Sequence, residues 1–233
     1  MNGTAVRQFA APDRGSAPLP LICLVRHGQA SAGAEDHDVL SGLGCAQAAA
    51  VGHELARRGL RDPLVVSGTL TRQRDTARLL AEAADFTRPV REDARWNEYD
   101  HDALLAHCAE PLRGAASVRE SIDHALSAWM ADGTAAGGGS WADFARAAAD
   151  ALAELADLLG RGRDAVVVTS AGPVSALCGA LLSLPPAGVV ALHRVTVSAF
   201  VSTLVVGASG AGLLTFNEHG HFSGEQSRLR SYR

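Results

Sequence analysis

The chain has 233 residues, a formal net charge of −4, 47% hydrophobic residues and 20% charged residues. This composition can bury a sizeable core in one α/β domain and excludes general disorder. All 21 basic residues are arginine, which excludes Schiff-base chemistry through lysine and a Walker-type nucleotide loop. The acidic balance lacks the basic footprint of a nucleic-acid binder, so we expect no nucleic-acid partner.

Residues 1–20 are predicted to form a flexible leader, because no apolar run among them is long enough for a secretory signal. No later stretch has the length and apolarity of a membrane span. We therefore expect no membrane partner and a cytoplasmic location. The remaining residues, 21–233, are expected to form a single domain, in which the Gly/Ala-rich segment 132–140 is an internal flexible loop.

Apolar runs of strand length alternate with helical segments along this domain. Buried strands are predicted at 21–25, 64–67 and 165–169, and helices at 41–58, 70–84, 117–130, 141–159 and 173–182. Two extended runs, 195–206 and 213–216, flank a glycine-rich turn and predict a C-terminal antiparallel hairpin. The alternation predicts an α/β three-layer sandwich, with a mostly parallel central sheet and helices on both faces.

The four cysteines of the chain include no C-x-x-C pair, which argues against a zinc or redox site. Cys23, Cys45 and Cys178 lie in apolar strand-like or helix-like runs, and we expect them to be small buried hydrophobic residues. No group of carboxylates or histidines stands at metal-ligand spacing. We therefore expect neither a metal nor a cofactor.

Polar residues follow each predicted buried strand, at the edge where open α/β sheets bind their ligands. Arg26 and His27 follow the first strand directly. Arg72 lies five residues after the second strand ends, and Ser170 follows the third at a helix start. Glu98 lies in an irregular stretch between residues 89 and 112. We expect these side chains to share one rim of the sheet.

Arginine, histidine and glutamate on one rim suit the transfer of a phosphoryl group. The arginine fork matches phosphate oxygens and keeps its charge near neutral pH. A neutral imidazole can attack phosphorus and carry the phosphoryl group, and a carboxylate can protonate the leaving oxygen and then activate water. Helix N-termini after the strands add backbone donors for an anion. The sequence therefore predicts metal-independent phosphoryl transfer from a monoester.

Several motifs resemble those of the histidine phosphatase superfamily, the phosphoglycerate-mutase-like clan. They are Leu24-Val25-Arg26-His27-Gly28-Gln29-Ala30, Leu40-Ser41 with Gly44 and Gln47, Ser67-Gly68-Thr69-Leu70-Thr71-Arg72 with Thr76-Ala77, and Val166-Val167-Val168-Thr169-Ser170-Ala171-Gly172. The resemblance implies that His27 is the phosphorylated nucleophile and that Glu98 is the proton donor. It also implies that Arg26 and Arg72 bind the phosphate.

One position departs from the family pattern, because the family's second histidine would fall at Ser170. A hydroxyl can donate one hydrogen bond to a phosphate oxygen but supplies no positive charge. We expect Ser170 to bind phosphate as a neutral donor, and His101 is a candidate for compensation because it lies near Glu98. His219 and His221, after the last predicted strand, are expected to have surface or packing roles.

The function that these residues predict is hydrolysis of a small-molecule phosphomonoester through phosphohistidine at His27. Phosphoglycerate-mutase-type transfer shares the first step but needs a bound alcohol in place of water. A catalytically weak phosphate-ligand binding or regulatory protein is a further alternative, which Ser170 favours. The joint presence of Arg26, His27, Arg72 and Glu98 argues against mere binding. A homodimer is possible, and the substrate stays open.

Overall fold

The computed structural model describes residues 18–31, 38–107, 118–132 and 139–232. Most of the predicted leader, Cys108, and the centre of the predicted loop at 132–140 lie outside these ranges. The last residues of the predicted leader are hydrogen-bonded to the domain. Pro20 accepts from the Val206 N–H at 2.9 Å, and Arg61 donates to the carbonyl oxygens of Pro18 and Leu19. Residues 18–20 are therefore bonded to the domain.

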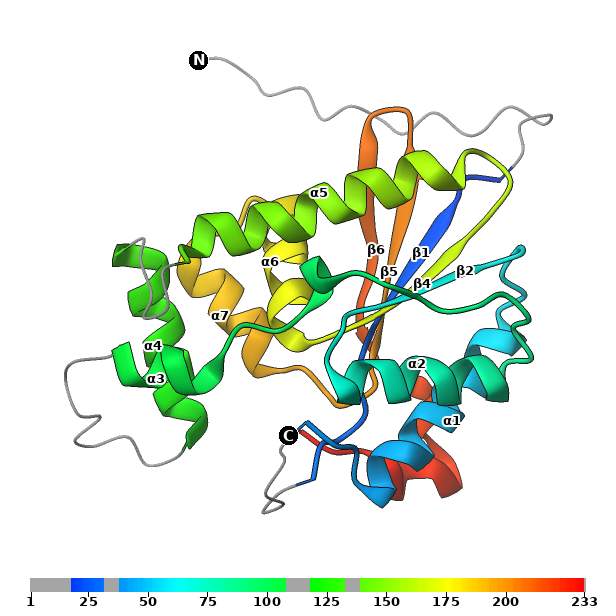
Figure 1. The fold of residues 1–233 in the computed structure, drawn as a ribbon, viewed down its shortest axis with the longest axis horizontal. Helices are drawn as coiled ribbons and strands as arrows, with labels where there is room; N and C mark the ends of the chain where they lie inside the picture. The colour runs from blue at the N-terminus through cyan, green and yellow to red at the C-terminus, as the bar shows by residue number, and fades with distance from the viewer. Residues whose placement is uncertain (1–17, 32–37, 108–117, 133–138, 233) are drawn as a thin grey trace.

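A six-stranded mixed sheet forms the centre of the molecule (Figure 1). Its order is β3-β2-β4-β1-β5-β6; the first four strands run parallel, and β5 and β6 are antiparallel to their neighbours. The strands are β1 (Leu21–Arg26), β2 (Leu64–Ser67), β3 (Arg91–Glu92), β4 (Ala165–Thr169), β5 (Val201–Gly207) and β6 (Gly210–Glu218). All residues of β4 are buried, which explains its continuous apolar run.

Helices cover both faces of the sheet, with α1 and α2 on one side and α5 and α6 on the other (Figure 1). The bounds are α1 (Gly42–Arg57), α2 (Thr71–Ala83), α3 (His101–His107), α4 (Val118–Asp132), α5 (Trp141–Leu159), α6 (Ala171–Leu181) and α7 (Pro186–Arg194), with short 3-10 helices η1 (Ala94–Trp96), η2 (Gly220–Phe222) and η3 (Gly224–Leu229). The predicted three-layer fold with its C-terminal hairpin is confirmed.

Serines and a glycine delimit the helices as the sequence indicates. Ser41 Oγ accepts from the Gly44 N–H at 3.0 Å and begins α1, and Ser140 Oγ accepts from the Asp143 N–H at 3.0 Å and begins α5. Gly160, with φ +56°, follows the last residue of α5. Such caps satisfy backbone groups that an isolated helix end leaves without partners.

A second, smaller core lies beside the sheet. There α3 and α4 pack together, and α4 packs against α7 (Figure 1). Its buried side chains include Tyr99, Leu126 and Trp129, and the Tyr99 and Trp129 rings lie edge to face with centroids 5.5 Å apart. Tyr99 of this core directly follows Glu98 in the chain, so the core lies next to the segment that carries this candidate site residue.

The predicted strand at 195–206 is wrong in its first half. Residues up to Arg194 form α7, which the prediction missed, and β5 begins only at Val201. The backbone between them has mixed partners: the Asn217 side chain accepts from the Val197 N–H and donates to the Val195 carbonyl, and the next two N–H groups donate to the carbonyls of Ser231 and His27. The prediction also missed α3 and β3. The helix predicted from residue 173 begins earlier, at Ala171.

The cysteines follow the prediction at two of three described positions. Cys23 and Cys178 are buried, and burial raises the pKa of Cys23 to about 11 and that of Cys178 to about 12. Cys45 is exposed, so its predicted burial is wrong. It lies on the solvent side of α1, whose buried side instead carries Gln47, Ala48 and Val51.

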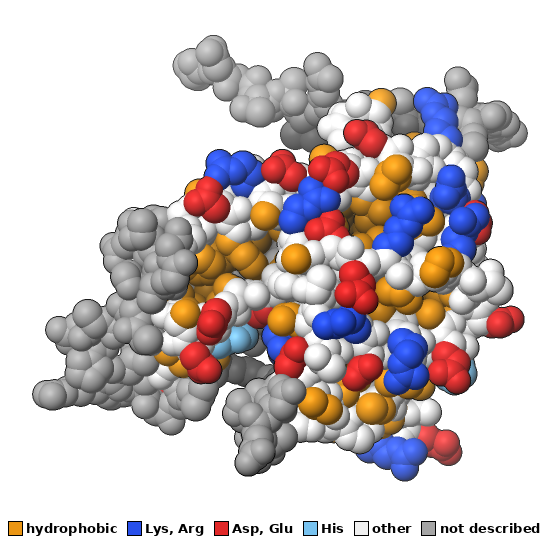
Figure 2. All heavy atoms as spheres, in the orientation of Figure 1, with side chains coloured by type: hydrophobic (Ala, Val, Ile, Leu, Met, Phe, Trp, Pro, Cys, Tyr) orange, Lys and Arg blue, Asp and Glu red, His pale blue; other side chains and the backbone are white. Residues whose placement is uncertain are grey.

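Surface charges pair locally. Arg95 in η1 pairs with Glu154 of α5 at 2.6 Å and with Asp93 at 2.7 Å. Acidic and basic side chains also neighbour each other along α5 (Figure 2). Exposed pairs of this kind contribute little to stability. Within the described ranges, no helix combines the length and apolarity needed to cross a membrane.

Candidate active site

His27 lies directly after β1, at the carboxyl end of a central strand. Arg26 pairs with Thr169 of β4 in the parallel register, and the His27 N–H donates to the Thr169 carbonyl at 2.9 Å. On the other side, the His27 carbonyl accepts from the Ala199 N–H at 3.2 Å. Backbone contacts on both sides thus fix the imidazole at this edge of the sheet.

The protonation of the His27 ring follows from its two neighbours. Nδ1 lies 2.7 Å from the Gly28 carbonyl oxygen, which can only accept, so Nδ1 carries the hydrogen. Nε2 lies 3.2 Å from Arg72 Nε, which can only donate, so Nε2 carries the lone pair. Burial and the charges of Arg26 and Arg72 lower the pKa of His27 well below 6.5. The ring is therefore neutral at neutral pH, with a nucleophilic Nε2.

Arg72 is held at the start of α2 by a carboxylate. Its Nη1 lies 2.8 Å from Asp38 Oδ1, and its side chain is mostly buried. The Asp38 carboxylate also accepts from the Thr71 N–H at 2.7 Å. Partial burial opposes ionisation of Asp38, but these backbone bonds and the Arg72 charge hold its pKa below the usual range. Asp38 thereby orients the guanidinium whose Nε meets His27.

Arg26, the last residue of β1, is held by the segment that follows α7. Its Nη1 donates to Thr196 at both the carbonyl oxygen, at 3.1 Å, and Oγ1, at 3.2 Å. The charge of Arg26 is among the causes that lower the pKa of His27. The charges of Arg26 and Arg72 thus both act on the His27 imidazole.

Glu98 lies between η1 and α3, and its carboxylate reaches the start of α6, the helix that follows β4. Its Oε2 accepts from the Gly172 N–H at 3.1 Å, and its Oε1 accepts from the Tyr99 N–H at 3.3 Å. A β-carbon on Gly172 would overlap Glu98 Oε1, so only glycine leaves room for the carboxylate. The helix N-terminus is a favourable place for this negative charge.

Ser170 and His101 both adjoin these residues. Ser170 is the N-cap residue of α6 and is fully buried; its Oγ accepts a hydrogen bond from Gln73 and makes no capping bond to the helix. The His101 ring lies 4.6 Å from the Tyr99 ring, centroid to centroid. The charge of His101 is a minor cause of the lowered pKa of His27. His101 therefore lies on the same rim.

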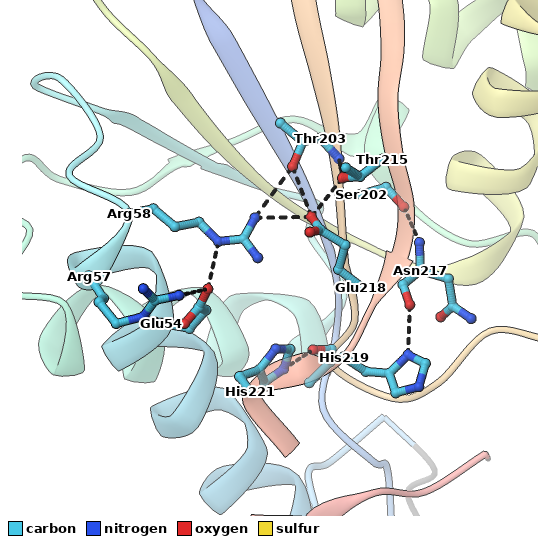
Figure 3. Close-up of polar contacts among 11 residues, drawn as sticks. Glu54, Arg57, Arg58, Ser202, Thr203, Thr215, Asn217, Glu218, His219 and His221 are labelled. Carbon is cyan, nitrogen blue, oxygen red and sulfur yellow. Dashed lines mark hydrogen bonds and ion pairs between the residues drawn. The ribbon is translucent and has the colours of Figure 1, made fainter. Parts of the chain in front are cut away.

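His219 and His221 have backbone partners (Figure 3). His219 Nδ1 lies 2.7 Å from the Asn217 carbonyl, and His221 Nε2 lies 3.0 Å from the Ala199 carbonyl. Burial lowers the pKa of His221. These contacts agree with the packing roles expected from the sequence. Among the described residues, no group of three or more His, Cys, Asp or Glu could hold a metal ion.

The sequence analysis missed three residues that hold the site together. Asp38 and Thr196 orient the two arginines, and Gln73 bonds to Ser170. Asp38 is the last residue of a polar loop before a helix, and this position only weakly indicates a helix-capping role. Nothing in the sequence marks Thr196 or Gln73, because their partners are 170 and 97 residues away.

Comparisons with known proteins identify the family and the fold. The model of the histidine phosphatase superfamily (branch 1) matches residues 22–219. Among curated protein sequences, none matches the chain.

Solved structures include close matches in fold. A mycobacterial glucosyl-3-phosphoglycerate phosphatase, solved in complex with VO3, is 31% identical; the match covers 86% of this chain and 100% of that one, with a TM-score of 0.64. A mycobacterial hydrolase is 28% identical, with 91% and 95% covered and a TM-score of 0.63. A phosphoserine phosphatase from Entamoeba histolytica, at 18% identity, 87% and 99% coverage and a TM-score of 0.64, shows the shared fold alone.

Proposed function

The chain belongs to the histidine phosphatase superfamily, and on that premise we propose that it hydrolyses small-molecule phosphomonoesters through a phosphohistidine on His27. The observation that carries the proposal is the state of the imidazole. Its hydrogen is on Nδ1, bonded to Gly28, and the Nε2 lone pair faces the Arg72 guanidinium. A neutral nucleophile beside a cation is what attack on an anionic phosphoryl group requires.

In the first step, the Nε2 lone pair of His27 attacks phosphorus while the bond from phosphorus to the ester oxygen breaks. The protonated carboxyl of Glu98 gives its hydrogen to that oxygen, and an alcohol leaves. Arg26 and Arg72 bind the charge of the phosphoryl oxygens, and Arg72 exchanges its contact with Nε2 for one with an oxygen. Ser170 and the backbone donors of α6 add neutral hydrogen bonds.

In the second step, the Glu98 carboxylate takes a proton from water, and the resulting hydroxide oxygen attacks phosphorus. The bond from phosphorus to Nε2 breaks, its electron pair returns to the imidazole, and inorganic phosphate leaves. The two arginines supply the positive charge throughout, so we propose that turnover is independent of metal. We also propose that the protein is cytoplasmic and forms a homodimer.

The substrate proposal starts from the mycobacterial relatives. One of them, 29% identical to this chain, is described as a glucosyl-3-phosphoglycerate phosphatase in complex with inorganic phosphate. We propose that glucosyl-3-phosphoglycerate heads the panel of monoesters to be tested. Ser170 favours a second candidate, a phosphate-binding protein with weak turnover, because a buried neutral hydroxyl provides less charge stabilisation than a cation.

The test is acid quench after brief exposure to a labelled monoester. Label that is bound to protein, acid-labile and base-stable is expected in the wild-type protein and absent in His27→Ala. Steady-state turnover on the panel is measured for both proteins. Turnover of His27→Ala at the wild-type level would refute the proposal, whereas phosphate binding without turnover in the wild type would favour the binding protein.

A further inference from the structure

Gln73 is a buried amide that connects three segments of the candidate site. It lies in the first turn of α2, one residue after Arg72, and its exposed fraction is 0%. Its Nε2 donates to the Trp96 carbonyl oxygen at 3.0 Å and to Ser170 Oγ at 2.9 Å. Because a carbonyl oxygen can only accept, the amide has one possible orientation, with Nε2 toward Trp96.

Both acceptors of this amide adjoin the support of Glu98. Trp96 is two residues before Glu98 in the chain. Ser170 is two residues before Gly172, whose N–H donates to Glu98 Oε2 at 3.1 Å. Gln73 therefore braces both the backbone that carries the Glu98 side chain and the helix start that binds its carboxylate.

The surroundings leave the Gln73 amide little freedom to move aside. A β-carbon at Gly68 would overlap Gln73 Oε1 and would lie 2.6 Å from Asn97 Oδ1. Asn97 is itself fixed, since its Oδ1 accepts from the Thr69 N–H at 2.6 Å and its Nδ2 donates to Thr69 Oγ1 at 2.8 Å. The amide thus fills a slot that a glycine keeps open.

We propose that Gln73 is a positioning residue for the acid Glu98, an inference that rests on the proposed function. Gln73 does not touch the substrate. It holds the Trp96 backbone and Ser170 at the spacing that keeps the Glu98 carboxyl within hydrogen-bond reach of the leaving oxygen. Proton transfer demands that reach, so a small displacement of the carboxyl lowers the rate.

The experiment compares two leaving groups in Gln73→Met, which keeps the side-chain length and removes both donors. Nitrophenolate leaves without a proton, whereas an alkoxide needs one. We expect kcat/KM, which covers only the steps up to departure of the alcohol, to fall about tenfold for an alkyl phosphate and to stay within about twofold for nitrophenyl phosphate, less than the effect of losing an acid outright. The same comparison in Glu98→Gln measures the full acid effect.

Gln47 provides a matched control for the loss of a buried amide. It is also fully buried, and its Nε2 donates to the Leu229 carbonyl at 2.6 Å and to Ser231 Oγ at 2.9 Å. Its Oε1 also accepts from the Gln29 N–H at 2.8 Å, two residues after His27. Gln47→Met should therefore destabilise the fold to a similar degree and lower the rate equally for both leaving groups, since none of its contacts involves Glu98. Ser170→Ala is the second variant: it removes one acceptor of the amide together with the proposed phosphate donor, so kcat/KM should fall for both substrates and fall further for the alkyl phosphate.

The outcomes separate this inference from the proposed function. Equal losses on both substrates in Gln73→Met and Ser170→Ala, beside a normal leaving-group dependence in Glu98→Gln, would overturn the positioning role alone. Equal losses in Glu98→Gln would overturn the acid role and the inference with it. In a Glu98→Gln background, Gln73→Met should add no further leaving-group dependence, since the acid is already gone; a full additional loss on the alkyl substrate would also overturn it.

Discussion

Two mostly buried arginines, Arg58 and Arg72, lie near the ends of adjacent helices but have different partners. Arg58, after α1, pairs with Glu54 at 3.0 Å and with Glu218 at 3.1 Å (Figure 3). Arg72, at the start of α2, pairs with Asp38 and donates its Nε to the neutral ring of His27. The first cation meets two carboxylates, whereas the second meets one carboxylate and the neutral His27 imidazole.

The neighbours of the two arginines differ in the same respect as their direct partners. Glu218 also accepts from Thr203 and Thr215, so the Arg58 cluster joins α1 to the β5–β6 hairpin (Figure 3). Around Arg72, a second cation, Arg26, acts on the same imidazole. A buried arginine by itself thus indicates nothing about function. The balance of charge around the arginine distinguishes a structural ion pair, as at Arg58, from a site suited to an anion, as at Arg72.

Exchange of each arginine for methionine is the strongest test of this difference. Arg72→Met should lower kcat/KM for nitrophenyl phosphate by about 10²–10³-fold, the range for losing one electrostatic donor. Arg58→Met leaves Glu218 without its cation and Glu54 with Arg57 alone, and should lower the free energy of unfolding by about 1–3 kcal/mol. Its folded form should keep wild-type kcat. Steady-state kinetics and urea unfolding measure both, and the reverse pattern would refute the comparison.

The pH dependence of kcat/KM sharpens the comparison. Burial, Arg26 and Arg72 lower the pKa of His27 well below 6.5, so activity on nitrophenyl phosphate should persist as the pH falls through 6.5. Arg72→Met should move this acid limb to higher pH, and Arg58→Met should leave it in place. A limb unchanged in Arg72→Met would contradict the assignment of His27.

The same pKa shift predicts how stability changes with pH. The folded chain resists protonation of His27, while the unfolded chain accepts a proton near pH 6.5. This contribution to stability is therefore present above pH 6.5 and is lost as the pH falls below it. His27→Asn should remove that part of the pH dependence, which urea unfolding at several pH values measures.

Asp38→Asn tests the single carboxylate beside Arg72. The amide keeps an acceptor for the guanidinium but removes the negative charge, so the pocket becomes more positive. Inorganic phosphate should then inhibit about 2–5-fold more tightly at low ionic strength, and the gain should shrink in salt. Tighter inhibition that ignores salt would argue against an electrostatic cause.

The smallest effect is expected from chelators. Because the arginines provide the positive charge, incubation with EDTA should leave kcat on nitrophenyl phosphate unchanged within error. Activity that is lost in EDTA and restored by magnesium or zinc would show that a metal provides charge that we assign to Arg26 and Arg72.

The parts of the molecule that the sequence predicts are those with local signals. Continuous apolar runs mark the buried strands, and the polar residues directly after them, such as His27 and Ser170, lie at the predicted edge. Cys45 shows the limit of this approach, since an apolar run does not say which side of α1 faces solvent.

What the sequence does not reveal depends on contacts between distant residues. Thr196 meets Arg26 across 170 residues, and no periodicity marks that contact. The segment before β5 is apolar like a strand, yet its Val195 carbonyl and Val197 N–H bond to the Asn217 side chain. Such residues become visible only when the sheet brings the segments together.

Gly172 has a consequence for attempts to engineer this enzyme. Its backbone is not in the left-handed region, so its conformation does not require glycine, and alanine would favour the helix. A β-carbon there would nevertheless displace the Glu98 carboxylate and lie 2.7 Å from Tyr99 Cε1. Replacing Gly172 with alanine for its helix propensity would therefore require both the buried Tyr99 ring and the Glu98 carboxylate to move. A substitution intended to stabilise α6 would displace the proposed acid although no proposed catalytic residue had changed.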